Sequence, residues 1–445
     1  MSGPAATGGG AADGRAPALA RVLTRRDLVA IGINQVIGSA VFLLPAQVAA
    51  QVGAWAPLAF VLAAGGTLLV ALCFAEAGSR FTGTGGAYLY ARTAFGPFVG
   101  FEVGWMAWFT RAASQAAVSA GLTLALGFYW PALASGAGRA ATIAVVTLAL
   151  GAVTYRGIQQ SAWLVKALTV AKLLPLAVFV LVGVWHVEPA RLVPHGGVTI
   201  EQALAAGLLL IFAFGGFDVI AVPAGEAAQP RRDVPVAFVV TIAVVAAIYV
   251  CAQVGATGTV PDLAAWATRL ADAARLTMGP GGALLISLGA IFAMSGNIAG
   301  QVLAGSRYLF ALAEQGDLPR WFGRVHPRFR TPSNATVFTT VVTLALALSG
   351  SFAALAVVSA IARLLVYAGT CAATLALRSP RAAGGVAPAG FVVPGGPLVP
   401  AAGFVVSVGV IFGATRQQVL GGALFLLIGA VLYVVARRTV RPAAG

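Results

Sequence analysis

The sequence predicts an all-α membrane protein that crosses the bilayer many times, and three observations lead to this fold class. Of its 445 residues, 59% are hydrophobic and only 9% are charged, against roughly a quarter charged in an ordinary soluble domain. The apolar residues gather in runs of about 20, the length that crosses a bilayer as a helix. The basic residues fall mainly on one side of these runs. Too little polar surface remains to cover a soluble core, which excludes a soluble enzyme, a disordered chain and a disulfide scaffold.

Twelve apolar runs are assigned as membrane-spanning helices. In chain order they lie at about 27–51, 55–78, 98–127, 140–155, 163–184, 202–225, 235–258, 281–312, 335–350, 352–377, 398–413 and 418–436. Polar or Pro/Gly-rich segments separate them, the longest inside the chain being 314–334 and 378–397.

The net charge of +15 is explained by topology. With the N-terminus inside, the inner loops and tails carry eighteen of the 28 basic residues, the outer loops five and the spans five. This excess follows the positive-inside rule, so we expect a multi-pass protein of the cell (inner or plasma) membrane with both termini in the cytoplasm. The basic balance therefore does not indicate a nucleic-acid partner.

Two features argue against targeting, metal and cofactor roles. Residues 1–24 are rich in glycine and alanine and lack the apolar segment of a signal peptide, so we expect a disordered cytoplasmic tail. Cys73, Cys251 and Cys371 fall in apolar runs and are predicted to be buried thiols, while the three histidines lie in loops far from any cysteine. We expect no metal and no cofactor.

The first and sixth spans carry signals for a broken helix. Gly38 lies in the middle of the first span with Pro45 seven residues later, and Gly216 and Pro223 repeat this interval in the sixth. In the inferred topology the two spans run in opposite directions. Paired interruptions in oppositely oriented halves indicate the inverted repeat of one class of secondary transporters.

The inverted repeat predicts how the chain is divided. We expect one half with five spans over 25–200, a second over 201–380, and two further spans with a cytoplasmic C-terminus over 381–445. Unwound backbone is tolerated in a membrane only where it lines a protein cavity. The alternative is that the glycines only allow close helix packing.

The first break predicts hydrogen-bond donors for a carboxylate. If the helix stops near Gly38, the N–H groups of Ser39, Ala40 and Val41 lie at the positive end of the helix that follows. Such groups stabilise an anion.

The ends of the preceding half-helices predict acceptors for an ammonium group. They are the carbonyls at about Val36 and Ile37 in the first span and near Ala213 and Gly215 in the sixth. Donors for a carboxylate beside acceptors for an amine predict a site for a zwitterionic α-amino acid.

Four motifs in order along the chain resemble the amino acid–polyamine–organocation (APC) family of transporters. IGSAVFLLPA resembles its first span, GTGGAYLYARTAFGPFVGFEVGW its second-to-third connection, FAFGGFDVIAVPAGEAAQPRRDVP its sixth span and the following loop, and GSRYLFALAEQGDLPRWFGRVHPRFRTPSNA its exit from the eighth span. The resemblance runs from about Arg25 to Arg381. It implies the five-plus-five inverted-repeat (LeuT-like, APC) fold, alternating access and a central amino acid site at the two breaks.

The resemblance also assigns residues to that site. Residues 38–40 match the backbone that binds the substrate carboxylate, with Ala40 in place of the glycine found in many members. Phe212 matches the aromatic residue that closes over bound substrate, although it could equally be an ordinary packing residue. Gly215 and Gly216 match the unwound part of the sixth span.

Ionisable residues deep in a membrane are costly and indicate function by default. Here they are Glu102, Arg111, Lys172, Asp218 and Arg363. Lys172 is the most informative, because the chain has 26 arginines but only two lysines, and a buried lysine, unlike an arginine, can lose its proton. The resemblance places Lys172 where sodium-coupled relatives hold the ion, which implies sodium-independent transport by proton symport or exchange. The alternative is a lysine that extends towards the inner surface.

The two deep arginines bear on the substrate. Asp218 is the expected partner of Arg111 or Arg363, and an arginine that faced the pocket instead would disfavour cationic substrates and polyamines by like-charge repulsion. Glu102 is a candidate for a proton path or an inner gate.

The sequence thus predicts a secondary active transporter and not an enzyme. Its expected partners are an amino acid, neutral in preference to cationic, membrane lipids and, for symport, protons. The alternative is a cationic amino acid or polyamine transporter of the same fold. A channel or an intramembrane enzyme is disfavoured, because the spans contain neither a ring of filter residues nor a Ser/His or paired-Asp arrangement. The sequence gives no oligomeric state.

Overall fold

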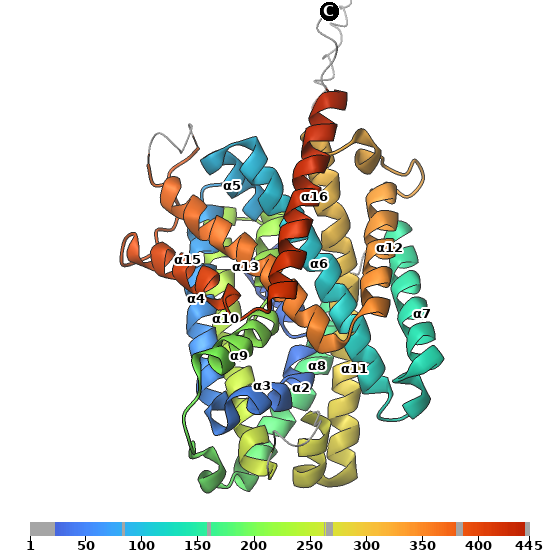
Figure 1. The fold of residues 1–445 in the computed structure, drawn as a ribbon, viewed down its shortest axis with the longest axis vertical. Helices are drawn as coiled ribbons and strands as arrows, with labels where there is room; N and C mark the ends of the chain where they lie inside the picture. Colours follow the sequence, from blue (N-terminus) through green and yellow to red (C-terminus); the bar gives the residue numbers. More distant parts are fainter. Residues whose placement is uncertain are drawn as a thin grey trace, which may run out of the picture.

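The computed structural model describes residues 23–81, 85–157, 162–261, 263, 270–379 and 386–440. Within these residues the chain forms α-helices and short 3₁₀ helices, and its β contacts are two isolated bridges, Leu23 with Ala227 and Val325 with Pro332. The long helices stand side by side in one bundle (Figure 1). The predicted all-α class is confirmed.

The bounds of the helices follow the apolar runs. The α-helices are α1 (Arg25–Val36), α2 (Ala40–Leu43), α3 (Pro45–Val52), α4 (Ala56–Gly78), α5 (Ala87–Phe95), α6 (Pro97–Leu126), α7 (Gly136–Tyr155), α8 (Ala162–Gly183), α9 (Ile200–Ala213), α10 (Pro230–Thr259), α11 (Leu270–Glu314), α12 (Ser333–Ser349), α13 (Phe352–Ala376), α15 (Leu398–Ile411) and α16 (Arg416–Val440). The 3₁₀ helices are η1 (Gly53–Trp55), η2 (Pro131–Leu133), η3 (Val184–His186), η4 (Pro189–Leu192), η5 (Phe217–Glu226) and η6 (Arg320–Gly323).

Each predicted span coincides with helix. Among the described residues, nine helical segments are long and apolar enough to cross a bilayer. α6 is not among these nine. Two further apolar helices, α12 and α15, are shorter, with 17 and 14 residues. A protein with many membrane-spanning helices is therefore confirmed, while the number twelve remains a prediction.

Local sequence signals set several helix ends. Thr24 caps α1, because its hydroxyl oxygen accepts from the Asp27 amide at 3.3 Å while the Asp27 carboxylate accepts from the Thr24 amide at 3.0 Å. This reciprocal capping box satisfies two donors at a helix start. In α11 the backbone turns at Gly279, with φ 69°, directly before Pro280. The kink lies just before residue 281, where the predicted eighth span begins.

The first predicted span is broken twice. α1 ends at Val36, α2 occupies only 40–43, and α3 begins at Pro45, whose nitrogen cannot donate a helical hydrogen bond. α3 then lies across the lower part of the bundle instead of along it (Figure 1). The sequence predicted one interruption, marked by Gly38 and Pro45, where the structure has two.

The sixth span is broken at the predicted glycines. α9 ends at Ala213, the chain turns through Gly215 and Gly216, and η5 continues with the tighter 3₁₀ geometry. Gly216 has φ 117°, a conformation that L side chains rarely adopt, and a Cβ there would lie 2.7 Å from the Gln35 carbonyl oxygen. A glycine is required because the backbones of the two broken spans meet at this point.

Equivalent spans of the two predicted halves pack against each other. α1 packs against η5, α4 against α10, α6 against α11 and α7 against α12. α2 and α3 contact α9, so the two broken spans lie antiparallel. This is the arrangement expected for the predicted inverted repeat, and it brings the two breaks together.

The basic loops predicted to be cytoplasmic gather at one end of the bundle, uppermost in Figure 1. At this end, two buried carboxylates accept hydrogen bonds from segments that are distant in the sequence. Glu76 accepts from Arg378 at 2.6 Å, and Asp317 accepts from Arg92 and, at 2.8 Å, from the Tyr88 hydroxyl. Burial and the hydrogen bond to Asp317 raise the pKa of Tyr88, so this tyrosine stays neutral. These contacts tie α4 to the segment after α13, and α5 to the segment after α11.

Some expectations fall outside the described residues or need correction. The predicted tail lies outside them as far as residue 22, as do five arginines counted for topology: Arg15, Arg21, Arg269, Arg381 and Arg441. The side chains of Lys166 and Pro223 are not described either. Cys73 and Cys371 are buried as expected, but Cys251 is exposed. An apolar neighbourhood in sequence did not distinguish the core face of α10 from its outer face.

Candidate functional site

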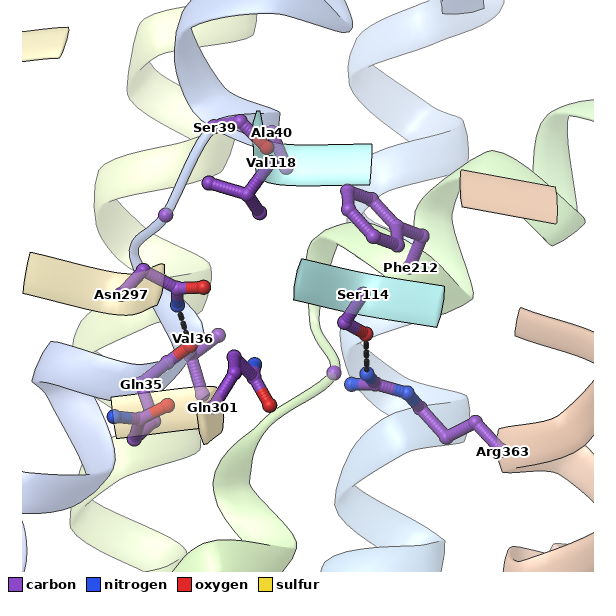
Figure 2. Close-up of a pocket in the computed structure, with 12 residues that line it drawn as sticks. Gln35, Val36, Ser39, Ala40, Ser114, Val118, Phe212, Asn297, Gln301 and Arg363 are labelled. Carbon is purple, nitrogen blue, oxygen red and sulfur yellow. Dashed lines mark hydrogen bonds between the residues drawn. The ribbon is translucent and has the colours of Figure 1, made fainter. Parts of the chain in front are cut away.

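A small cavity lies where the two broken spans meet α6, α11 and α13. Its walls combine backbone from both breaks with amide, hydroxyl and guanidinium groups (Figure 2). The lining residues are Gln35, Val36, Gly38, Ser39, Ala40, Ser114, Val118, Phe212, Gly215, Asn297, Gln301 and Arg363.

The carbonyls at the end of α1 accept hydrogen bonds from three neighbouring helices. The side-chain amide of Asn297 donates to the Gln35 carbonyl at 2.7 Å, and the Tyr249 hydroxyl donates to the Val36 carbonyl at 3.0 Å. A Cβ at Gly38 would lie 3.0 Å from the Asn297 amide nitrogen, so the missing side chain lets α11 approach the break. The break is thus a packed, hydrogen-bonded structure rather than a loose loop.

Lys172 of α8 also donates hydrogen bonds to the end of α1. Its ammonium donates to the Asn34 carbonyl and the Asn34 side-chain oxygen, both at 2.7 Å, and to the Ile37 carbonyl at 2.8 Å. The side chain is 0% exposed. The carbonyl of Ile37, which sequence reasoning offered to a substrate ammonium, therefore already accepts from an ammonium of the protein itself.

The predicted donors lie at the start of α2. Ser39 precedes the helix, and its carbonyl accepts from the amides of Phe42 and Leu43, both at 3.1 Å. The N–H groups of Ser39, Ala40 and Val41 thus belong to the first turn, where a helix supplies no acceptor. Ser39 and Ala40 line the cavity, whereas Val41 is buried behind them.

The second break is packed against Arg363 of α13. The guanidinium occupies the place where a Cβ of Gly215 would stand, so a larger residue would displace it. Phe212 lines the cavity beside the break, with its ring edge-on to Phe352 at 5.8 Å. Ala213 is buried behind the wall of the cavity.

Arg111 and Asp218 form a buried ion pair between α6 and η5. Asp218 is thus the partner of one of the two deep arginines, as expected. The second guanidinium nitrogen of Arg111 donates to the side-chain oxygen of Gln301, a cavity residue, at 3.2 Å. The pair links the segment after the second break to α6 and α11.

Arg363 has a different environment from Arg111. Its Nη2 donates to the Ser114 hydroxyl at 2.8 Å, and Ser114 lies 2.6 Å from the Ser359 hydroxyl. Within the described residues, no carboxylate lies at ion-pair distance from Arg363, although this side chain is only 2% exposed. Figure 2 shows the guanidinium beside Ser114, on the opposite side of the drawn pocket from Asn297.

Glu102 is the one deep charge that lies apart from both breaks. Its carboxylate packs against α16, where a Cβ on Gly429 would lie 3.1 Å from Oε2, and Glu102 is not a cavity residue. Its two carboxylate oxygens are buried without a hydrogen-bond partner among the described residues.

Sequence reasoning missed five of the polar or packing residues around the cavity. They are Gln35, Ser114, Val118, Asn297 and Gln301. A signal existed for two of them, because Asn297 and Gln301 stand four residues apart on α11 and therefore share one face of an otherwise apolar helix. Gln35 is also a polar residue three positions before the Gly38 break.

A bundle of apolar helices with two antiparallel broken spans around a central polar cavity is the architecture of secondary transporters. The chain belongs to the amino acid permease family, whose model matches residues 23–436.

Relatives carry related descriptions. An uncharacterised transporter of Mycobacterium tuberculosis is 34% identical over 334 residues, 74% of each chain. A methylthioribose transporter of Bacillus subtilis is 28% identical over 358 residues, 76% of each chain. A branched-chain amino acid permease of the same organism is 27% identical over 340 residues, 72% of this chain and 73% of that one. These names differ in cargo, so family membership indicates transport and leaves the particular substrate to the site.

Proposed function

We propose that this protein moves an α-amino acid across the cell (inner or plasma) membrane by alternating access, without sodium. The observation that carries the proposal is the cavity between two helix breaks, with amide donors at the start of α2 and side-chain acceptors nearby. We assign 25–200 and 201–380 as the two inverted halves and place both termini in the cytoplasm. α9 and α2 would then separate and approach as the cavity opens to either side.

The substrate carboxylate would bind at the start of α2. The N–H groups of Ser39 and Ala40 adjoin the cavity and have no acceptor within the helix, so they are free to donate to an anion there. The substrate ammonium would face the side-chain oxygens of Gln35 and Asn297, which are buried without partners. Donors and acceptors placed in this way suit a zwitterion, and Phe212 would cover the bound molecule.

Sodium independence follows from Lys172 in this proposal. A sodium ion would need a cage of oxygen atoms, and the three oxygens near Lys172 already accept from its ammonium. A second cation there would meet strong repulsion, because the site is fully buried. Proton symport requires Lys172 to lose and regain its proton, whereas exchange requires it to stay charged.

For substrate charge, we propose that neutral amino acids are carried in preference to arginine, lysine and polyamines. Arg111 does not contribute to this preference, since Asp218 pairs with it, but Arg363 adds a positive charge to the wall. The alternative is transport of cationic amino acids or polyamines. Tight binding of agmatine or putrescine without competition by any neutral amino acid would favour that alternative.

Uptake into liposomes containing the purified protein tests the proposal. Labelled amino acid should enter in sodium-free medium, and unlabelled amino acid preloaded inside should accelerate its entry. A rise in wild-type uptake with an inward pH gradient would indicate proton symport, and no change would indicate exchange. A strict requirement for sodium would contradict the role given to Lys172, and absence of carrier-type counterflow would contradict transport by alternating access.

A further inference from the structure

The ionisable groups close to the cavity carry an excess of positive charge. Arg111 and Asp218 cancel each other as an ion pair, whereas Lys172 is bound by neutral oxygens and Arg363 by a hydroxyl. Lys172 is not a cavity residue, so Arg363 is the formal charge on the described cavity wall. A buried charge without an opposite charge is costly, and a bound anion would remove that cost.

Arg363 retains unused hydrogen-bonding capacity. Its Nη2 donates to the Ser114 hydroxyl, and the Tyr367 hydroxyl also lies close enough to interact with the guanidinium through a hydrogen bond. Its Nε and Nη1 atoms are buried without a well-aligned partner among the described residues. A guanidinium can donate two parallel hydrogen bonds to one carboxylate. The packing of the guanidinium on Gly215 keeps it at the wall of the cavity, because no side chain separates it from the break.

Neighbouring ionisable groups cannot compensate this charge. Arg111 and Tyr367 are the ionisable groups that interact with Arg363, Arg111 through its charge and Tyr367 also through a hydrogen bond. Arg111 is a like charge already neutralised by Asp218, and tyrosine is uncharged at ordinary pH.

The remaining polar atoms divide the cavity into regions. Unpartnered side-chain oxygens of Gln35 and Asn297 suit the substrate ammonium, and the amides at the start of α2 suit its α-carboxylate. Arg363 lies across the drawn pocket from Asn297 (Figure 2), where the substrate side chain would extend.

We propose that Arg363 forms an anion subsite for a carboxylate on the substrate side chain, so that acidic amino acids are carried better than neutral ones. This proposal rests on the proposed function, and it retains the preference for neutral over cationic amino acids as substrates. The substrate class it names is the amino dicarboxylic acids, of which aspartate and glutamate are the simplest. In the bound state the side-chain carboxylate accepts from Arg363 and offsets its charge.

Matched pairs of substrates test the proposal on the wild-type protein. Aspartate and asparagine differ little in shape but differ in charge, as do glutamate and glutamine. In liposomes, half-maximal uptake should need about tenfold less of the acid than of the amide in at least one pair, as expected for a charge-assisted hydrogen bond. Amides carried as well as, or better than, their acids in both pairs would overturn the proposal.

Substitution of Arg363 gives a second test. Arg363→Gln should abolish the advantage of the acid over the amide, and Arg363→Lys should retain part of it. The control is Arg416→Gln, which removes an arginine from the exposed start of α16 and should leave the preference unchanged. A preference for acids that survives in a folded Arg363→Gln protein would overturn the proposal. If that variant does not fold, the wild-type pairs still decide.

Measuring uptake with and without chloride distinguishes a subsite for a substrate carboxylate from a subsite for a free anion. If chloride fills the subsite, neutral amino acids will need chloride for uptake and acids will have no advantage, which would overturn the proposal. Uptake of neutral amino acids alone, independent of chloride, would also overturn it while leaving the proposed function intact. If neither class is carried by the folded wild type, the proposed function fails as well.

Discussion

At the first break, the Lys172 ammonium from α8 donates to three oxygens at the end of α1. At the second break, the Arg363 guanidinium from α13 packs on the bare backbone of Gly215 and donates through Nη2 to the Ser114 hydroxyl. Both breaks begin from glycine in an apolar helix, and both adjoin a cation from another span. The first cation is fully hydrogen-bonded and stands behind the wall, whereas the second is incompletely bonded and faces the cavity. Lys172 therefore belongs to the framework that holds α1, and Arg363 is available to a ligand.

The largest expected effect is that of removing the satisfied cation. Lys172→Ala deletes the donor for the Asn34 and Ile37 carbonyls, and each charge-assisted hydrogen bond contributes about 1.5–3 kcal/mol. We expect uphill uptake in liposomes to fall by about 100-fold or more. The matched control is Lys166→Ala, the other lysine of α8, with uptake within about twofold of wild type. Wild-type uptake by the Lys172 variant would show that the first break does not depend on this ammonium.

The next effect concerns the ion pair that follows the second break. Asp218→Asn leaves the Arg111 guanidinium buried without its counter-charge, and such a loss costs about 3–5 kcal/mol. We expect a clear fall in the thermal unfolding temperature in detergent. Adding Arg111→Gln should restore part of the stability, because the two residues are coupled. Equal unfolding temperatures for wild type and Asp218→Asn would remove the ion pair from the description of this break.

A third, smaller effect tests the contact between the two breaks. Gly216→Ala forces an alanine into φ 117° and sets its Cβ 2.7 Å from the Gln35 carbonyl oxygen, at a cost of about 1–3 kcal/mol. Gly421→Ala is the control, since a Cβ at this position in α16 has no neighbour within 4 Å. It should leave stability unchanged or raise it by up to about 1 kcal/mol. Equal tolerance of both substitutions would mean that the breaks do not need this close approach.

The smallest effect is expected at the deep charge remote from both breaks. Glu102→Gln keeps the shape of a side chain that packs against α16 and lines no part of the cavity. Uptake should remain within about twofold of wild type at neutral pH, as for most substitutions outside a functional network. A loss comparable to that of Lys172→Ala would assign Glu102 to the transport path and extend function beyond the two breaks.

The spans and their breaks could be predicted because they depend on local properties of the chain. Apolar length sets the helices, and glycine and proline interrupt them, so residues 38 and 216 marked the breaks without knowledge of the packing. The same reasoning did not predict that α3 is a separate helix lying across the bundle. Pro45 was seen as part of one interruption, whereas the structure uses it to begin a new helix.

The partners of the deep charges could not be predicted because they depend on tertiary packing. The sequence left Asp218 as a partner for either arginine, and only the tertiary structure, which brings Arg111 of α6 to Asp218 of η5, selects Arg111. Sequence reasoning predicted that the Ile37 carbonyl accepts from the substrate ammonium, whereas in the structure it accepts from the Lys172 ammonium. The cavity amides were missed because polar residues were considered only when they were ionisable. A search for amides on one face of an apolar helix would have found Asn297 and Gln301.

Competition between an amino acid and its decarboxylated amine tests most directly whether the first break binds a substrate carboxylate. Uptake of a labelled amino acid into sodium-free liposomes would be measured in the presence of three competitors. They are the unlabelled amino acid, its α-carboxamide and the amine formed by removal of the α-carboxylate. If the amides of Ser39, Ala40 and Val41 hold the carboxylate, the amino acid should compete fully, and the amide and amine should compete at least about tenfold less well. Equal inhibition by the amino acid and its amine would contradict this assignment.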